Sequence, residues 1–294
     1  MNKVGFIGVG IMGKSMVRNL MKAGFELHIY ARTKSKVEDV ISEGAQFHES
    51  IKDCVQDCDA VITIVGFPQD VEEVYFDEGN ILDSAKKGAY LIDMTTTSPQ
   101  IAEKIYEEGT KRGFHVMDAP VTGGDTGAKS GTLSILVGGE KEDYEACMPL
   151  FEAMGTNINY QGKAGCGQHC KLANQIMIAG TLSGVCEALT YAKEQGLDPE
   201  VFMKSVATGA AGSKQLDTFG PKILKDDYAP GFFMKHFIKD MKLALIEANR
   251  KGLSLDVLSM VLANYEELEQ EGYGDLGTQA LMKFCDEEHR NTEE

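Results

Sequence analysis

The chain has 294 residues, enough for two domains of ordinary size, and 43% of them are hydrophobic. Its formal net charge of -16, from 45 acidic and 29 basic residues, argues against a nucleic-acid partner or an anionic membrane surface. No run reaches the ~18 uncharged apolar residues that a membrane-spanning helix needs, and the start of the chain does not read as a secretion signal. We therefore expect a cytoplasmic protein whose seven cysteines are reduced thiols.

The first half of the chain alternates short apolar strands with amphipathic helices. The predicted strands cover residues 3–10, 26–30, 60–66, 89–94, 114–120 and 132–139. The predicted helices cover residues 15–24, 36–44 and 100–113. Ser35 and Glu38 have the spacing of a capping box, and Ser98 precedes a proline as an N-cap residue does. This β-α-β-α order predicts a Rossmann-type, doubly wound sheet over residues 1–162.

After Gly162 the pattern changes from alternating strands to continuous helices. One helical pattern runs from residue 165 to 194, longer than an ordinary globular helix. Further helical patterns cover residues 199–208, 237–252 and 255–272. We predict an all-α domain over residues 163–294.

Three soft ligands at the start of the long helical pattern invite a test for zinc. Cys166, His169 and Cys170 share one helix face, but no fourth ligand is apparent nearby. Because structural zinc takes four protein ligands, we expect free thiols and no metal.

The stretch GVGIMGKS fits two phosphate-binding motifs. Gly8, Gly10 and Gly13 form G-x-G-x-x-G, the dinucleotide turn, whereas the outer two glycines with Lys14 and Ser15 form the P-loop of nucleoside triphosphatases. Both motifs place phosphate on backbone N–H groups at a helix N-terminus, so these eight residues alone do not decide between them.

The end of the second predicted strand favours the dinucleotide. An NAD enzyme has an acidic residue there, but this chain has Arg32 in the sequence ARTKSK, and an arginine can pair with a 2′-phosphate. We therefore predict NADP(H) in preference to NAD(H). The triphosphatase remains a distant alternative, with Asp93 or Asp118 at a strand end as its magnesium ligand. The predicted cofactor-binding residues of these two segments are Gly8, Gly10, Ile11, Met12, Gly13, Arg32, Thr33 and Lys36.

Three longer motifs occur in register along the chain: GFIGVGIMGKSM, DAPVTGGDTGAKSGTLSILVGG and GCGQHCKLANQ. Together they resemble the β-hydroxyacid dehydrogenases, the family of 3-hydroxyisobutyrate dehydrogenase and of the tartronate and glyoxylate/succinic semialdehyde reductases. The resemblance covers nearly the whole chain and extends to IKDMKLA near Lys239. It implies a 6-phosphogluconate dehydrogenase-like helical domain that forms homodimers or homotetramers. It also implies hydride transfer between a nicotinamide and a small β-hydroxyacid or its semialdehyde.

The third motif supplies the residue expected to handle the proton. In the family pattern G-x-G-x-x-x-K-x-x-N the lysine is Lys171, the predicted general acid/base, and the asparagine is Asn174. Gln175 follows where the family usually has a second asparagine, which leaves the shape of the carboxylate pocket open. This departure from the family pattern also keeps open a second hypothesis, that the chain is a cofactor-binding scaffold or sensor without turnover. The resemblance implies that Asn174 and Gln175 bind the substrate.

The second motif supplies an expected anion site. Backbone N–H groups of Thr122, Gly123 and Gly124 can form a nest for the substrate carboxylate. Further segments resemble the family's cofactor loops, and Lys239 resembles the lysine that closes over the nicotinamide. The cofactor contacts implied in this way are Val65, Gly66, Phe67, Pro68, Thr96, Lys239 and Asp240.

Overall fold

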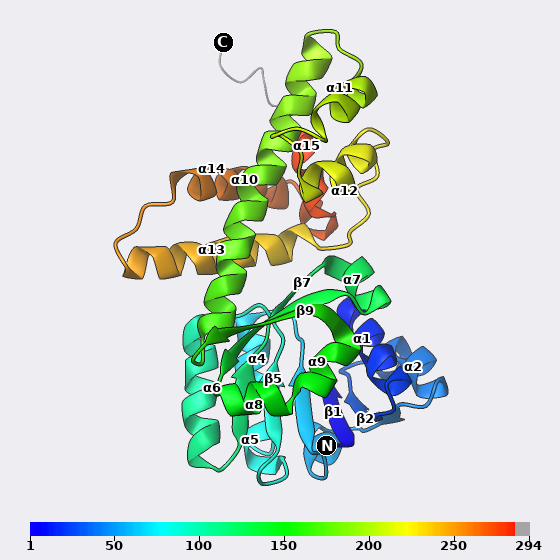
Figure 1. The fold of residues 1–294 in the computed structure, drawn as a ribbon, viewed down its shortest axis with the longest axis vertical. Coiled ribbons are helices and arrows are strands. Elements are labelled where there is room, and N and C mark those ends of the chain that lie inside the picture. Colours follow the sequence, from blue (N-terminus) through cyan, green and yellow to red (C-terminus); the bar gives the residue numbers. More distant parts are fainter. Residues whose placement is uncertain (286–294) are drawn as a thin grey trace. The chain divides into compact units, whose positions relative to one another are not determined.

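The computed structural model describes residues 1–285 of the chain (Figure 1). The chain divides into two compact units, Met1–Lys171 and Leu172–Glu294. The division falls within one long helix, α10 (Cys166–Glu194), and each unit has its own hydrophobic core.

The first unit is built on a nine-stranded sheet. Its strands are β1 (Lys3–Ile7), β2 (Glu26–Tyr30), β3 (Gln46–Phe47), β4 (Ala60–Thr63), β5 (Tyr90–Asp93), β6 (His115–Asp118), β7 (Val121–Thr122), β8 (Leu133–Gly139) and β9 (Gly155–Gly162). Their order is β3-β2-β1-β4-β5-β6-β8-β7, and β9 pairs with β8. The pairs from β3 to β6 are parallel, whereas β8 is antiparallel to β6 and β7. The parallel part has the Rossmann strand order, so the predicted fold class is confirmed.

Both faces of this sheet are covered by helices (Figure 1). Phe6 and Ile62 belong to the core on one face, whereas their neighbours Ile7 and Val61 belong to the core on the other. The first core includes residues of α1 (Ile11–Lys22), α2 (Glu38–Ser42), α7 (Gly124–Ser130) and α9 (Met148–Met154). The second includes residues of α3 (Ile51–Val55), α4 (Pro68–Phe76), α5 (Ile81–Ser84) and α6 (Pro99–Lys111). Burial on both faces explains why the strands read as continuous apolar runs.

The regular elements of the second unit, in the part that the structure describes, are helices, apart from one isolated β-bridge between Phe233 and Gly277. Besides the C-terminal part of α10, its α-helices are α11 (Pro199–Val206), α12 (Lys214–Ile223), α13 (Met234–Arg250), α14 (Asp256–Gln270) and α15 (Met282–Cys285). Its core includes Leu182 of α10, Phe237 of α13 and Tyr265 of α14. The buried Tyr265 hydroxyl donates a hydrogen bond of 2.7 Å to the carbonyl of Thr278. The predicted all-α character of this half of the chain therefore agrees with the structure.

Helix α10 has the length and composition of a membrane-spanning helix. Its apolar residues nevertheless contribute to the core of the helical unit, where Ala179, Leu182 and Cys186 are fully buried. A central helix of a globular domain has the same composition because it is surrounded by other helices.

Two predicted helix starts have different outcomes. Ser98 is the N-cap of α6, and its side chain accepts a hydrogen bond of 3.2 Å from Gln100 N–H, as predicted. The prediction of a capping box formed by Ser35 and Glu38 is wrong. Ser35 lies in a 3₁₀ turn, Lys34–Lys36, and α2 begins only at Glu38, with Val37 as its N-cap residue. This 3₁₀ turn lies between β2 and α2, and sequence spacing alone does not reveal it.

Candidate active site

Five of the predicted segments lie at one edge of the sheet. The glycine turn follows β1, Arg32 follows β2, the segment 65–68 follows β4, Thr96 follows β5, and Thr122 follows β6. Because β2, β1, β4, β5 and β6 are parallel neighbours, their carboxyl ends share an edge. The connections reverse direction between β1 and β4, and nucleotides bind at such a switch point.

The three glycines of the first turn are required for different structural reasons. A Cβ atom on Gly8 would lie 2.1 Å from the Ile64 carbonyl oxygen, and one on Gly13 would lie 2.2 Å from the Gly8 oxygen. The fold itself therefore requires these two glycines. A Cβ on Gly10 would meet no protein atom within 4 Å. The space over Gly10 fits a ligand that approaches the backbone closely, as the pyrophosphate of a dinucleotide does.

Lys14 has a protein partner. Its Nζ lies 2.8 Å and 2.9 Å from the two carboxylate oxygens of Asp39. Arg18 binds the same carboxylate at 2.8 Å, and the two cations hold the pKa of Asp39 well below its usual range. A P-loop lysine must instead reach the phosphates, so this pairing disfavours the triphosphatase.

Arg32 extends into solvent beyond β2. Its side chain is 74% exposed, and Nη1 lies 3.2 Å from Oδ1 of Asp70 in α4. Thr33 is the N-cap residue of the following 3₁₀ turn, and Lys36 ends that turn on the surface. A guanidinium has five N–H donors, so Arg32 can bind an anion while it contacts Asp70.

The segment after β4 packs against the segment after β5. Val65 N–H donates to the Thr95 hydroxyl at 3.0 Å. Pro68 is the first residue of α4, and Phe67 N–H donates to Asp70 Oδ2 at 2.9 Å. Gly66 and the exposed edge of Phe67 complete this surface segment.

The carboxyl end of β5 contains a buried acid. Asp93 Oδ1 accepts hydrogen bonds from the Thr63 hydroxyl at 2.8 Å and from Thr95 N–H at 3.1 Å. Burial raises the pKa of Asp93 to about 6. Asp93 thus orders the start of the loop that contains Thr96. Its Oδ1 binds this loop and β4, and the side chain is only 2% exposed, so it is not open to a magnesium ion.

The segment after β6 exposes its backbone. Gly123 has φ 129° and Gly124 has φ 64°, values that favour glycine. Both glycines are exposed, and Thr122 is half-buried at the end of β7. A backbone with these dihedral angles can present consecutive N–H groups to an anion.

Helix α10 begins on a buried carboxylate. Asp118 Oδ1 accepts a hydrogen bond from Gly165 N–H, and Oδ2 accepts one from Gln168 N–H, each at 2.8 Å. Burial raises the pKa of Asp118 from its ordinary value. A Cβ on Gly167 would lie 2.4 Å from the Leu136 oxygen, so this first turn rests directly on the strands. Lys171 follows in the second turn and is only 7% exposed.

The predicted residues of the helical unit also come together. Gln175 Oε1 accepts a hydrogen bond from Asn174 at 2.8 Å, and Gln175 Nε2 donates to Asp240 Oδ2 at 2.7 Å. Lys239 Nζ lies 3.0 Å from Asp240 Oδ1. Asp240 is 1% exposed and Gln175 is 2% exposed. The four residues form one polar network on α10 and α13, in which Gln175 and Asp240 are buried and Asn174 and Lys239 are half-buried.

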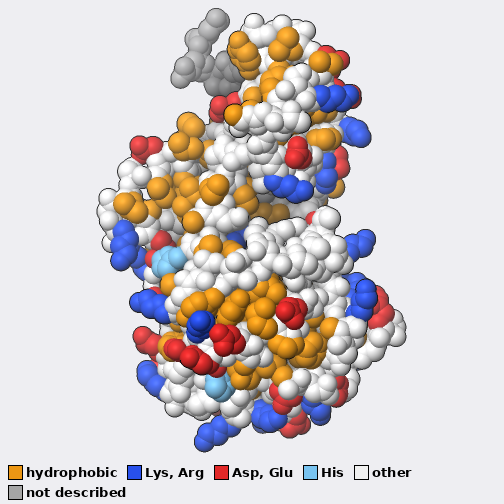
Figure 2. Space-filling model, in the orientation of Figure 1, with side chains coloured by type: hydrophobic (Ala, Val, Ile, Leu, Met, Phe, Trp, Pro, Cys, Tyr) orange, Lys and Arg blue, Asp and Glu red, His pale blue; other side chains and the backbone are white. Residues whose placement is uncertain are grey.

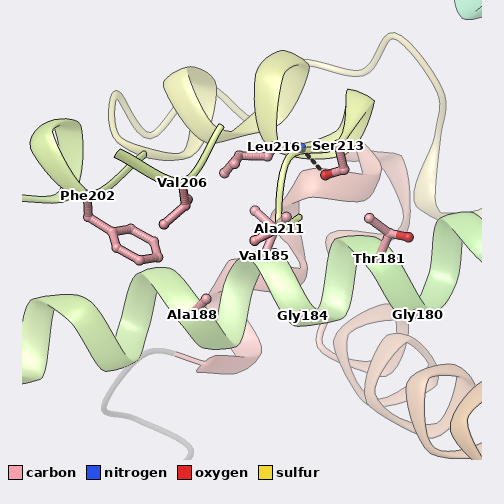
Figure 3. Close-up of a pocket in the computed structure, with 10 residues that line it drawn as sticks. All are labelled: Gly180, Thr181, Gly184, Val185, Ala188, Phe202, Val206, Ala211, Ser213 and Leu216. Carbon is pink, nitrogen blue, oxygen red and sulfur yellow. Dashed lines mark hydrogen bonds between the residues drawn. The ribbon is translucent and has the colours of Figure 1, made fainter. Parts of the chain in front are cut away.

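The helical unit also contains a pocket of about 230 Å³ between α10 and the segment from α11 to α12 (Figure 3). It is lined by small and apolar side chains, among them Phe202, Val206 and Leu216, and its hydroxyls come from Thr181 and Ser213. The ten lining residues include no titratable group. This pocket therefore offers no acid/base chemistry.

Comparison with known proteins accounts for almost the whole chain. Residues 3–162 match the family described as the NAD binding domain of 6-phosphogluconate dehydrogenase. Residues 165–285 match the NAD-binding family of NADP-dependent 3-hydroxyisobutyrate dehydrogenase. The chain belongs to the β-hydroxyacid dehydrogenase family. It is an NAD(P)-dependent oxidoreductase that acts on the CH–OH group of small hydroxyacids. This assignment takes the place of the two alternative hypotheses, a nucleoside triphosphatase and a cofactor-binding scaffold without turnover.

Individual β-hydroxyacid dehydrogenase relatives match over most of their length. An uncharacterized oxidoreductase of Bacillus subtilis is 50% identical, covering 96% of this chain and 98% of the relative. An Arabidopsis thaliana protein named probable 3-hydroxyisobutyrate dehydrogenase-like 1 is 44% identical, covering 95% and 84%. The solved structure of Mycobacterium tuberculosis 3-hydroxyisobutyrate dehydrogenase with L-serine is 26% identical, with a TM-score of 0.88, covering 96% and 98%.

Three further residues of this family member organise the site and were not predicted to do so. Asp70 pairs with Arg32, Asp118 anchors α10, and Gln168 binds the loop around Thr96. The sequence did show Asp118 at a strand end and Gln168 three residues before Lys171. The partners of Asp70, Asp118 and Gln168, however, are 38 to 73 residues away from them in the chain.

Proposed function

We propose that this enzyme transfers hydride between NADP(H) and a small β-hydroxyacid or its semialdehyde, with Lys171 as general acid/base. The observation that carries this proposal is the placement of Lys171. It is 7% exposed, one turn beyond a helix start that Asp118 and Gly167 fix to the carboxyl edge of the sheet. In reduction the ammonium donates a proton to the forming alkoxide, and in oxidation the neutral amine accepts the hydroxyl proton.

The substrate carboxylate would bind to the segment 122–124. Support comes from the positive φ angles of Gly123 and Gly124 and from their exposure. Asn174 would bind the reacting oxygen or the carboxylate, with Gln175 beside it. The relative solved with L-serine binds a small hydroxyacid, which supports a substrate of this size and charge.

NADP(H) would bind across residues 1–162, with a smaller contribution from residues 163–294. The bound cofactor supplies the hydride donor or acceptor. Its pyrophosphate would lie against Gly10, Ile11 and Met12, and its 2′-phosphate against Arg32, Thr33 and Lys36. The remaining proposed contacts are Val65, Gly66, Phe67, Pro68, Thr96, Lys239 and Asp240.

The decisive experiment combines a substrate screen with a Lys171 variant. Short semialdehydes and β-hydroxyacids are screened by NADPH absorbance, and Lys171→Ala is then measured with the best of them. Lys171→Ala should bind NADPH as the native enzyme does and lose about 10³-fold or more in kcat. Lys193→Ala, a change at the exposed end of the same helix, serves as the control and should retain kcat. A Lys171→Ala enzyme with unchanged kcat would remove the proposed mechanism.

The NADP preference has its own test. Arg32→Asp should weaken NADPH binding by a further factor of at least about 10 relative to NADH, because the carboxylate repels a 2′-phosphate. Lys52→Asp, a charge reversal of the same size on the exposed face of α3, controls for net charge. If Arg32→Asp weakened the binding of NADPH and NADH equally, Arg32 would not be the residue that distinguishes the two cofactors.

We also propose that the helical unit associates with a second copy of the chain. Large apolar side chains are exposed on its helices, as Figure 2 shows for one face of the molecule. They include Met177, Tyr191, Val201, Ile246, Val257 and Met260, each at least 48% exposed. Sedimentation velocity should give a dimer or tetramer, and Val257→Glu should shift it toward the monomer.

The cysteines support a reducing, cytoplasmic compartment. Within residues 1–285 all seven are present as thiols rather than disulfides. Cys54, Cys58, Cys147 and Cys186 are buried, and burial raises the pKa of the first three thiols. Free thiols persist where glutathione and thioredoxin keep proteins reduced.

A further inference from the structure

Gln168 is a buried amide that joins two separate segments of the first unit. Its side chain is 0% exposed. Nε2 donates a hydrogen bond of 2.7 Å to the Thr95 carbonyl, and Oε1 accepts one of 3.0 Å from Thr97 N–H. Its own backbone N–H donates to Asp118 at 2.8 Å. The amide is therefore fixed at both ends.

The two residues that Gln168 binds flank Thr96. Thr95 and Thr97 are themselves buried, at 1% and 0% exposed, and Thr95 N–H is also held by Asp93. The loop cannot shift toward or away from α10 without breaking at least one of the two amide hydrogen bonds. Leaving either buried backbone group unpaired is costly, so the loop and the helix move as one body.

Lys171 lies three residues after Gln168 on the same helix, and residues at this spacing share a face. Gln168 thus connects the loop of Thr96 to the turn that carries Lys171. Both ends of this connection belong to the Met1–Lys171 unit.

We infer that Gln168 is a positioning residue that holds Thr96 and Lys171 at the separation that hydride transfer requires. This inference rests on the proposed function of those two residues. Hydride goes to the substrate carbon and the proton goes to the attached oxygen, so the nicotinamide and the lysine must hold a fixed distance. A misplacement of ~1 Å at such a site can cost about 100-fold in rate.

A second buried glutamine provides a matched control. Gln279 in the helical unit is 1% exposed, and its Nε2 donates to the carbonyls of Asp227 and Ala229 at 2.9 Å and 3.2 Å. Its Nε2 fixes a loop by donating to backbone carbonyls, as Nε2 of Gln168 does, although its Oε1 accepts no hydrogen bond from residues 1–285. Gln279 has no proposed contact with cofactor or substrate. Changing either glutamine should lower stability, whereas only Gln168 should affect the reaction.

The experiment compares Gln168→Glu, Gln168→Ala and Gln279→Glu in the full-length enzyme. Hydrogen exchange of the peptide that contains residues 95–97 is measured without cofactor, and the NADPH dissociation constant, kcat and KM are measured with it. Glutamate keeps the shape of glutamine but donates to the Thr95 carbonyl only when protonated. At neutral pH Gln168→Glu should speed exchange at residues 95–97 and lower kcat about 10- to 100-fold, with a smaller change in KM.

Two further results are expected. Relative to the native enzyme at the same pH, exchange protection and kcat of Gln168→Glu should both recover as the pH falls and the new carboxyl becomes protonated. Gln279→Glu should lower the Tm and leave kcat and exchange at residues 95–97 unchanged. If Gln168→Ala does not fold, the pH-dependent recovery of Gln168→Glu decides the question alone.

Three results would overturn the inference. The first is native kcat and native exchange at residues 95–97 in Gln168→Glu at neutral pH. The second is a loss of kcat in Gln279→Glu as large as that in Gln168→Glu. The third is a loss of kcat in Gln168→Glu that does not recover with pH. Lys171→Ala separates the two proposals, because turnover in that variant removes the proposed function, whereas an inactive Lys171→Ala beside a normal Gln168→Glu removes only the inference.

Discussion

Gln175 donates a hydrogen bond of 2.7 Å to the carboxylate of Asp240, 65 residues away in the sequence. Both side chains are almost fully buried, and Lys239 lies 3.0 Å from the other carboxylate oxygen. The amide that replaces the asparagine usual in this family thus binds a buried acid. Its extra methylene group sets its reach toward α13, while its oxygen orients Asn174.

Shortening Gln175 should therefore destabilise the helical unit. Gln175→Asn cannot span the distance to Asp240 without a shift of α10 or α13, which leaves a buried carboxylate oxygen without its donor. We expect the free energy of unfolding to fall by about 1–3 kcal/mol, measured by urea denaturation. Gln195→Asn, an exposed change just after the same helix, should be near neutral. Equal stability of the two variants would show that the amide of Gln175 contributes nothing.

Gly10 and Gly8 should respond in opposite ways to the same substitution. Gly10→Ala adds a methyl group where no protein atom lies within 4 Å, so stability should change by less than about 1 kcal/mol while NADPH affinity falls at least about 10-fold. Gly8→Ala combines φ +97° with a contact of 2.1 Å, so the protein itself should unfold more easily. Differential scanning calorimetry and NADPH fluorescence titration distinguish the two. Unchanged NADPH affinity in Gly10→Ala would contradict the pyrophosphate position.

Asp70 should oppose the binding of NADPH. Its carboxylate lies 3.2 Å from Arg32, so it competes with a 2′-phosphate for the guanidinium. Asp70→Asn removes the charge and keeps an oxygen for the hydrogen bond from Phe67 N–H. NADPH should bind several-fold more tightly and NADH should be unaffected, with the two dissociation constants measured in parallel at low and high salt, because salt screens exposed charges. An equal gain in affinity for NADPH and NADH would contradict competition for Arg32 and would indicate a change in the structure of α4 instead.

Asp93 should make stability fall as the pH rises. Burial raises its pKa in the folded state to about 6, above the unfolded value of 3.8, so the folded state binds more protons between these two values. The free energy of unfolding attributable to Asp93 is then highest below the unfolded pKa and decreases by roughly 2–3 kcal/mol as the pH passes 6. Asp93→Asn should remove this dependence. Measured by urea denaturation, its stability relative to that of the native protein should be higher at pH 7 than at pH 4.

The exposed Asp57→Asn is the control for this titration, because it changes the same net charge without burial. If native protein and Asp93→Asn show the same slope of stability with pH, the buried carboxyl of Asp93 is not the source. A loss of this slope in Asp57→Asn as large as that in Asp93→Asn would have the same meaning.

The local parts of this structure could be predicted from the sequence. Continuous apolar runs identified the parallel strands, and the glycine turn after β1 follows from residues that are neighbours in the chain. Ser98 with its proline predicted the start of α6 for the same reason. The strand β9 was missed because its residues are mostly exposed or half-buried and carry no apolar pattern.

Contacts between distant residues could not be predicted in this way. Arg32 was expected to bind an anion, but nothing near it in the sequence indicates Asp70, 38 residues later. Gln168 stands between two motif glycines and the lysine, and its role depends on a loop about 70 residues earlier. Such pairs are defined only when the sheet brings the carboxyl ends of its strands together.

The distribution of the thiols has a practical consequence for anyone who handles the enzyme. Four of the seven cysteines are buried in the three hydrophobic cores, and alkylating or oxidising reagents reach them last. Cys166 and Cys170 are partly exposed on the first turns of α10, and Cys170 immediately precedes Lys171. Oxidation in air or by labelling reagents should therefore begin at Cys166, Cys170 and Cys285, of which the first two lie beside the proposed catalytic lysine. A preparation could then lose turnover while its fold, judged by circular dichroism, is unchanged.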